Sequence, residues 1–270
     1  MRNFPPERIV CLTEETVETL YMLGEDTRIA GVSGYAVRPP QVRREKPRVA
    51  AFISADIGKI LALNPDLVLT FSDLQAEIVS ALVKEGVAVH AFNQRDVAGI
   101  FAMIETLSAL IGASEKGARL CAELRARLDR IEARQKELPR PRVYFEEWDE
   151  PMISGIGWVS ELIGIAGGDD IFPELAGKKS AKDRFVTTEQ VIAAAPDIVI
   201  GSWCGKKFRA DKFAARPGFD TLPAVRNGFV REVKSTIILQ PGPAALTDGL
   251  DAICEIIDAW RAVQKMKASA

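Results

Sequence analysis

The alternation of apolar and polar positions contains one pattern that occurs in both halves of the chain. The first copy runs from Ile60 to Thr70 and the second from Val191 to Gly201, and Pro-Asp interrupts each copy, at Pro65 and at Pro196. Because proline cannot continue a helix and restricts the residue before it, each copy predicts a helix that turns directly into a buried strand. The repeat therefore predicts two similar α/β lobes.

Strand-like and helical runs alternate around both copies of the repeat. This alternation is typical of a mainly parallel sheet covered by helices on both faces. Ser72 with Gln75, and Thr187 with Gln190, have the spacing of helix capping boxes. The expected strands are residues 9–12, 29–33, 67–70, 87–92, 143–146, 198–200 and 229–233, and the expected helices are 14–23, 75–84, 158–165 and 244–260.

One long amphipathic helix is expected between the two halves. Its apolar positions, Cys121, Leu124, Leu128 and Ile131, recur every three or four residues between charged ones, from Ser114 to Glu137. At 1.5 Å per residue such a helix spans roughly 35 Å, which is too long for one lobe. The sequence thus predicts two Rossmann-like lobes with mainly parallel sheets, residues 1–113 and 139–270, joined by one long rigid helix at 114–138.

Ligands of open α/β sheets bind beyond the carboxyl ends of the strands. The residues that follow the two repeated strands are Phe71-Ser72-Asp73 and Ser202-Trp203-Cys204. They become candidate walls of one cleft between the lobes.

The charge balance and hydropathy of the chain exclude several functions. The 270 residues include 35 Lys and Arg against 37 Asp and Glu, a formal charge of -2. This balance gives no general electrostatic attraction to nucleic acid or to an anionic membrane. No window approaches the roughly 18 uninterrupted apolar residues of a membrane span.

The amino-terminal residues and the cysteines bear on localisation. Residues 1–8 lead straight into a strand-like run without the apolar segment of a secretory signal. The four cysteines lie far apart and show neither metal-ligand nor disulfide spacing, which favours free thiols in a reducing compartment. We expect a cytoplasmic protein as the sequence stands, and a periplasmic one if a native leader was removed.

Aromatic residues gather in expected loops and helix starts of the second half. Trp148, Trp158, Trp203 and Phe208 would favour a flat conjugated ligand, because aromatic faces provide rigid apolar area. The alternative for Trp158 and Trp203 is packing in the core of their own lobe.

Several polar residues are candidates for contacts with the ligand. Lys206, Lys207, Arg209 and Arg38 could receive a phosphate, a carboxylate or an amide-rich rim, or could simply be solvated. Glu146 and Glu147 could accept hydrogen bonds from ligand amides.

The candidates for chemistry are few. Cys204, beside two lysines, could react or bind a metal centre, but a small residue at a strand end explains it as well. His90, the single histidine, follows the apolar alternation of its strand and is expected in the core. A hydrolytic triad, a protein metal cage and a nucleotide-binding loop, including one at Gly164 to Gly168, find no support.

Taken together, the residues resemble the helical-backbone (class III) substrate-binding proteins of ABC transporters, and within them the vitamin B12-binding family. The resemblance covers nearly the whole chain. It is carried by Arg8 to Leu12, Leu23-Gly24, Gly31 to Tyr35, Pro39-Pro40-Gln41, Asp56 to Leu69, the helix at Trp158 with Gly167-Gly168, and Pro241-Gly242-Pro243.

The resemblance implies a non-catalytic protein that holds a corrinoid, cobalamin or a relative of it, between the lobes without an intrinsic cofactor. Arg38 stands where the family often has Tyr, and Phe52 where a Trp often faces the ligand. The residues so implied in ligand binding, together with those found above, are Tyr35, Arg38, Phe52, Ser54, Phe71, Asp73, Glu147, Trp148, Trp158, Trp203, Lys206, Lys207 and Gln240.

The resemblance also implies a transporter partner, and it leaves alternative ligands and alternative functions open. Glu77 matches an acidic residue that family members present to an ABC-transporter permease, whereas residues 234–240 lack the corresponding second-lobe acid. The alternative ligands are haem and a ferric siderophore. The alternatives of other classes are a corrinoid- or tetrapyrrole-handling enzyme with Cys204 and Lys206 as reactive groups, and an adaptor that binds another protein.

Overall fold

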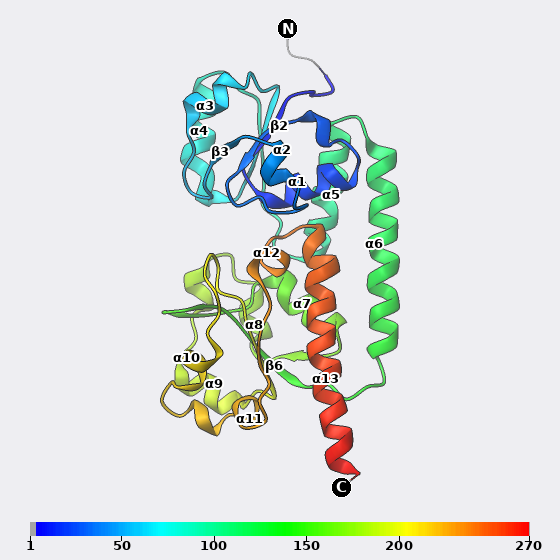
Figure 1. Cartoon of the computed structure of the whole chain (residues 1–270), viewed down its shortest axis with the longest axis vertical. Helices are drawn as coiled ribbons and strands as arrows, with labels where there is room; N and C mark the ends of the chain where they lie inside the picture. Colours follow the sequence, from blue (N-terminus) through cyan, green and yellow to red (C-terminus); the bar gives the residue numbers. More distant parts are fainter. Residues whose placement is uncertain (1–3, 270) are drawn as a thin grey trace. The chain divides into compact units, whose positions relative to one another are not determined.

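The computed structural model describes residues 4–269, which divide into two compact units (Figure 1). Unit 1 comprises the residues up to Gln94 together with Ala98–Glu123, and unit 2 comprises Arg95–Val97 and the residues from Leu124 onward. Where the sequence suggested a separate connecting segment at 114–138, the boundary lies inside helix α6 (Ser114–Gln135).

The sheet of unit 1 is wholly parallel, with strand order β3-β2-β1-β4-β5. This confirms the predicted fold class for the first half. Its strands are β1 (Ile9–Cys11), β2 (Ile29–Ser33), β3 (Arg48–Ala50), β4 (Leu67–Phe71) and β5 (Val89–Phe92). Central strands β1 and β4 are buried along their whole length, as expected for strands covered on both faces.

Helices cover both faces of this sheet (Figure 1): α3 and α4 lie on one side, and α1 and α5 on the other. The face under α3 and α4 is an aliphatic core that includes Val10, Val68, Ile60 and Leu82. The helices of unit 1 are α1 (Glu14–Met22), α2 (Val42–Glu45), α3 (Ile57–Ala62), α4 (Ala76–Lys84) and α5 (Val97–Leu110), with 3-10 turns η1 (Asp26–Arg28) and η2 (Asp73–Gln75).

The sheet of unit 2 has the order β10-β9-β6-β7, and β8 also pairs with β6. All pairs are parallel except β6 with β7, which form an antiparallel hairpin. The strands are β6 (Arg142–Asp149), β7 (Met152–Ser154), β8 (Asp169–Asp170), β9 (Ile198–Gly201) and β10 (Val230–Glu232). The sheet is thus mainly parallel, as the sequence predicted.

An aromatic core fills one face of the second sheet, beneath α9, α10 and α11, and it includes Tyr144, Phe213 and Phe219. Figure 1 shows α7 and α13 on the other side of this sheet. The helices are α7 (Gly157–Ile165), α8 (Pro173–Ala176), α9 (Thr188–Ala194), α10 (Ala210–Ala214), α11 (Pro223–Arg226), α12 (Ser235–Ile238) and α13 (Leu250–Ala268), with 3-10 turns η3 (Ala181–Arg184) and η4 (Phe219–Thr221) and a π-helical turn η5 (Ala245–Gly249).

Helix α6 confirms the predicted long amphipathic helix, with 22 residues. Its second half runs beside α13 (Figure 1), where Arg127 pairs with Asp251 and Arg261 donates to the side-chain oxygen of Gln135. No helix in the described part of the chain has the length and apolar character needed to cross a membrane.

The Pro-Asp repeat has the same local structure in both units. The residue before each proline, Asn64 or Ala195, has a left-handed backbone with φ of 46° or 44°. The carboxylate of Asp66 accepts the backbone N–H of Arg8 at 3.0 Å, and that of Asp197 accepts the N–H of Arg142 at 2.9 Å. In both units the aspartate N–H donates to the carbonyl of the same arginine at 2.8 Å. Each motif therefore joins the turn to the amino end of the neighbouring strand.

Of the two predicted capping boxes, one is confirmed and one is wrong. Thr187 and Gln190 form both reciprocal hydrogen bonds at the start of α9. At the other position Ser72 instead accepts from the N–H of Leu74, and Gln75 turns inward. The buried Gln75 amide accepts from the N–H of Phe71 and donates to the carbonyl of Phe52, so it ties two neighbouring loops together.

Candidate functional site

The carboxyl edge of the unit 1 sheet exposes large apolar side chains in three loops. Tyr35 follows β2, Ile53 follows β3 and Leu74 follows β4, with exposed fractions of 53%, 71% and 60%. Scattered exposed apolar residues are ordinary, but three at one sheet edge provide a surface for an apolar partner. The repeated strand thus ends at an edge suited to binding.

The other candidates in unit 1 lie around this edge with different degrees of exposure. Phe52 is half-buried, Ser54 and Asp73 are exposed, and Phe71 is buried. Arg38 is half-buried, and its Nε donates to the Glu18 carboxylate at 2.9 Å. The charge of Arg38 is therefore balanced inside the unit.

Sequence analysis missed a buried pair of acids at the same edge. Glu14 and Glu15 open α1 just beyond the carboxyl end of β1, and both are buried. Burial, the larger cause, and repulsion by the Glu14 carboxylate raise the pKa of Glu15 to about 8, although the Thr13 hydroxyl donates to it at 2.6 Å. Burial likewise raises the pKa of Glu14 to about 7. Acids in a first helical turn are common, so their burial could not be predicted from their position in the sequence.

These raised pKa values predict that the protein becomes less stable as pH rises. The folded state retains protons on Glu14 and Glu15 that the unfolded chain releases near 4.5, so the contribution of these two groups to stability is greatest below that pH and is lost as pH rises through about 7 to 8. In Glu15→Gln the loss of Tm between pH 5 and 9 should be smaller than in the wild type. Thermal unfolding followed by circular dichroism measures this.

The matched control for this prediction is Glu77→Gln, which removes an exposed carboxylate on α4. Its pH profile of Tm should follow that of the wild type. Equal pH profiles for Glu15→Gln and the wild type would contradict the assignment.

At the carboxyl edge of unit 2, lysine and tryptophan side chains gather around one buried acid, Asp149. Asp149, the last residue of β6, accepts hydrogen bonds from the Nζ atoms of Lys206 at 2.6 Å and Lys212 at 3.1 Å. The Lys206 Nζ also lies 4.0 Å from the ring centroid of Trp148, which is half-buried. Burial acts to raise the pKa of Asp149, but the two ammonium groups outweigh it and hold that pKa below its ordinary value.

The loop that carries Lys206 is fixed at both ends. Ser202 donates its N–H to the carbonyl of Glu146 at 2.9 Å, and Phe208 donates its N–H to the Glu232 carboxylate at 2.9 Å. The Phe208 ring is buried in the aromatic core. The lysine therefore projects from an anchored loop rather than from a free one.

Two predicted stacking residues, Trp158 and Trp203, are corrected by the structure. Trp203 is 2% exposed, packs edge-on against Phe208 and donates its indole N–H to Glu146 at 3.0 Å. Trp158 is buried and donates to the carbonyl of Ile238 at 2.8 Å. Both rings occupy the interior of unit 2, which is the packing role that the sequence left as an alternative, because apolar contacts and satisfied N–H groups hold them there.

The glutamates of β6 hold neighbouring arginines. Glu146 is fully buried and accepts from the Arg216 guanidinium at 2.5 and 3.0 Å. Burial nevertheless raises the pKa of Glu146 above its ordinary value. Glu147, a predicted ligand contact, accepts from the buried Arg184 at 2.6 and 3.2 Å. These carboxylates are thus engaged within the unit.

The remaining candidates are placed as follows. Lys207 and Cys204 are exposed, Gln240 is half-buried, and Glu77 is exposed on α4. His90, expected in the core, is half-buried, packs against Phe92 at 4.3 Å, and has its pKa lowered by burial. Within residues 4–269 no three His, Cys, Asp or Glu side chains lie together as metal ligands.

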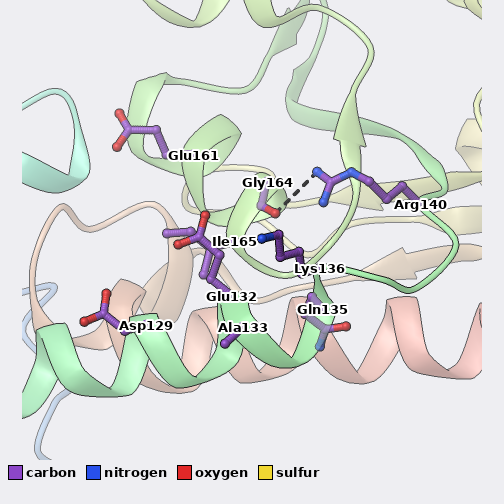
Figure 2. Close-up of a pocket in the computed structure, with 9 residues that line it drawn as sticks. All are labelled: Asp129, Glu132, Ala133, Gln135, Lys136, Arg140, Glu161, Gly164 and Ile165. Carbon is purple, nitrogen blue, oxygen red and sulfur yellow. Dashed lines mark hydrogen bonds between the residues drawn. The ribbon is translucent and has the colours of Figure 1, made fainter.

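Unit 2 also contains a cavity of about 790 Å³ whose lining includes several charged residues (Figure 2). It lies where the last turn of α7 meets the second half of α6 and Arg140, which precedes β6. The Arg140 guanidinium donates to the carbonyl of Gly168 and to the carboxylate of Asp169. Its positive charge is therefore balanced by Asp169. Figure 2 shows the carboxylates of Glu132 and Asp129 on the α6 wall of this cavity, and Lys136 just after the end of α6. This mixed-charge cavity, beside the amino end of β6, does not belong to the carboxyl edge.

Two Rossmann-like units whose carboxyl edges present apolar and aromatic side chains have the architecture of substrate-binding proteins. The family model described as periplasmic binding protein matches residues 9–236, and the chain belongs to this family. Substrate-binding proteins are not enzymes, so the enzymatic alternative with Cys204 and Lys206 as reactive groups is wrong.

Individual relatives agree with the class. A vitamin B12-binding protein of Vibrio parahaemolyticus is 26% identical over 270 residues, covering 99% of this chain and 94% of that protein. The crystal structure of the periplasmic vitamin B12-binding protein BtuF of Vibrio cholerae matches with a TM-score of 0.74 and 25% identity, over 96% of this chain and 99% of that one. The haem-binding protein RhuT of Roseiflexus sp. RS-1 has the same fold, with a TM-score of 0.79 and 24% identity over 93% and 98% of the chains.

Proposed function

We propose that this protein binds a corrinoid of the cobalamin class, through side chains at the carboxyl edges of its two sheets. The observation that carries the proposal is the exposure of Tyr35, Ile53 and Leu74, one in each of three loops at the unit 1 edge. A corrin macrocycle is broad and has apolar faces, and such a ligand gains affinity from exposed apolar side chains of this kind.

The charges at these edges favour a corrinoid over haem. Arg38 is paired with Glu18, Arg184 with Glu147, and Lys206 with Asp149. A haem has two propionates and so needs two cations beyond those already paired, whereas the rim of a corrin bears amides that need only neutral or already balanced partners. The vitamin B12-binding relatives support the same choice.

Calorimetric titration with hydroxocobalamin, read together with absorption spectra of the mixture, tests the proposal. We expect one-to-one binding and a change in the corrinoid spectrum. Haemin is titrated in parallel. A shifted Soret band with haemin, together with no heat and no spectral change with hydroxocobalamin, would replace the corrinoid by haem.

The apolar edge predicts the effect of a double substitution. Ile53→Ser with Leu74→Ser should raise the Kd for hydroxocobalamin by about tenfold or more, because each lost apolar contact removes about 1 kcal/mol of binding free energy. Val83→Ser is the control, since Val83 is 57% exposed but lies in the last turn of α4, away from this edge. Equal losses of affinity in the control and the double variant would show that the edge does not hold the ligand.

Delivery to an ABC-transporter permease through Glu77, whose exposure on α4 makes it accessible to a partner, is the role that a periplasmic location would allow. Helix α12 carries no acid for a second contact of this kind. Co-purification of the tagged protein with its permease, compared between wild type and Glu77→Lys, tests this part.

We further propose a cytoplasmic location, supported by the chemistry of the cysteines. Cys11, Cys121 and Cys254 are buried cysteines, and Cys204 is an exposed one. An oxidising compartment would expose Cys204 to intermolecular pairing. Recovery of the native protein in the periplasmic fraction after osmotic shock would overturn the location without touching the ligand.

A further inference from the structure

The lysine cluster of unit 2 has one more positive charge than its buried acid can balance. Lys206 and Lys212 share the two oxygens of Asp149, at 2.6 and 3.1 Å. The Asp149 side chain is 2% exposed, whereas the lysine side chains are 40% and 53% exposed. The carboxylate therefore lies beneath the two ammonium groups, and the surplus charge faces solvent.

A second acid near this cluster does not cancel the surplus. Glu150 lies 4.0 Å from the Lys212 Nζ, and its side chain is 83% exposed. A carboxylate at that distance and exposure is weakly coupled and screened by salt. Lys207, next in the chain to Lys206, is exposed and offsets Glu150 in the formal count, so three lysines against two acids leave one surplus positive charge.

Aromatic rings hold the lysines in place. The Lys206 Nζ lies 4.0 Å from the Trp148 ring centroid and 4.9 Å from that of Trp203, and the Lys212 Nζ lies 5.8 Å from the latter. Cation–π contacts together with the Asp149 bonds restrict rotamers that a free surface lysine would explore. A restricted ammonium group loses less entropy when it binds an anion.

From this geometry we infer that Lys206 and Lys212 bind one monoanionic group of the ligand, the phosphodiester of a corrinoid that carries a nucleotide loop. One surplus charge matches one monoanion, and ammonium groups are point-charge donors suited to phosphate oxygens. This inference rests on the proposed function, since it assigns a part of the same ligand to unit 2.

The test compares cyanocobalamin, which has the phosphodiester, with cobinamide in its cyano form, which lacks the nucleotide loop. In Lys206→Met with Lys212→Met, we expect the Kd for cyanocobalamin to rise about tenfold, the usual loss for charge-assisted hydrogen bonds, and the Kd for cobinamide to change less than twofold. In the wild type, raising the salt concentration should weaken cyanocobalamin binding more than cobinamide binding, and this difference should vanish in the double variant.

The matched control is Lys265→Met, which removes an exposed lysine from α13 and should change neither Kd. Circular dichroism checks the fold of the double variant. We expect this fold to be retained because both replaced side chains are partly exposed. Equal changes in the two Kd values, or none, would overturn the inference and leave the corrinoid proposal standing. A wild-type protein that binds neither corrinoid would overturn the proposed function and this inference with it.

Discussion

Replacing Arg216 by methionine is expected to lower the free energy of unfolding by about 3–5 kcal/mol, because it leaves the buried Glu146 carboxylate without its cation. The guanidinium holds both oxygens of Glu146, and it also lies over the rings of Phe213 and Phe219 at 5.0 and 5.6 Å. Methionine keeps much of the apolar contact while removing the charge. Urea unfolding followed by tryptophan fluorescence measures the loss, since Trp203 bonds to the same carboxylate.

The loss should shrink at low pH and in a double variant. Burial already raises the pKa of Glu146, and removal of Arg216 raises it further, so protonation of Glu146 relieves the unpaired charge as pH falls. Arg216→Met combined with Glu146→Gln should recover part of the stability at neutral pH. Lys212→Met is the control, because this partly exposed lysine should contribute less than about 1 kcal/mol. If Arg216→Met lost no more free energy of unfolding than Lys212→Met, the buried pair of Arg216 and Glu146 would not have this stabilising role.

Replacing Gly201 by alanine is expected to destabilise the protein by about 1–3 kcal/mol, since it overpacks the aromatic core. A Cβ at this position would lie 2.0 Å from two ring carbons of Phe208, at the end of β9. The ring can move only by shifting the loop that follows β9, and this loop carries Lys206. We therefore expect a lower urea midpoint together with a change in the environment of Trp203, seen in the near-ultraviolet circular dichroism spectrum.

Gly164→Ala is the control for that substitution. Gly164 lies in α7, and a Cβ there meets nothing within 4 Å. Alanine should be neutral or stabilise by about 0.5–1 kcal/mol through helix propensity. An unchanged urea midpoint for Gly201→Ala would contradict this prediction, because it would mean that the Phe208 ring can move aside without loss of stability.

The main elements of the fold could be predicted from local patterns. The Pro-Asp segments marked β4 and β9, because proline stops a helix wherever it occurs and the apolar runs that follow are too short for anything but buried strands. Helix α6 could be predicted because its apolar spacing persists over 22 residues. The antiparallel turn of β7 beside β6 was not foreseen, since a strand of three residues is too short to show an alternation.

Burial was harder to predict than secondary structure. Trp203 follows a strand directly, as a ligand contact would, but the anchored Phe208 and the buried Glu146 hold its ring inside unit 2. Glu14 and Glu15 look like ordinary first-turn acids, and only the surrounding structure shows that both are buried. Gln75 looked like half of a capping box, whereas its amide bridges loops far apart in sequence.

The charge state of the candidate site also depends on distant partners. Lys206 and Lys212 lie 57 and 63 residues from Asp149, and Arg38 lies 20 residues from Glu18. No spacing rule connects such pairs, so the sequence indicated a basic rim where the structure has ion pairs. The proposed preference for a corrinoid over haem rests on these pairs.

The bonds from Asp66 and Asp197 to the starts of the neighbouring strands lie at the edge of each sheet opposite to the carboxyl-edge loops. They fix how β1 aligns with β4, and β6 with β9, without any contribution from the carboxyl-edge loops. Substitutions in the carboxyl-edge loops should therefore leave the alignment of these strands unchanged. A chain with such a division is a practical scaffold for building receptors for new flat ligands, with mutagenesis confined to one rim of each half.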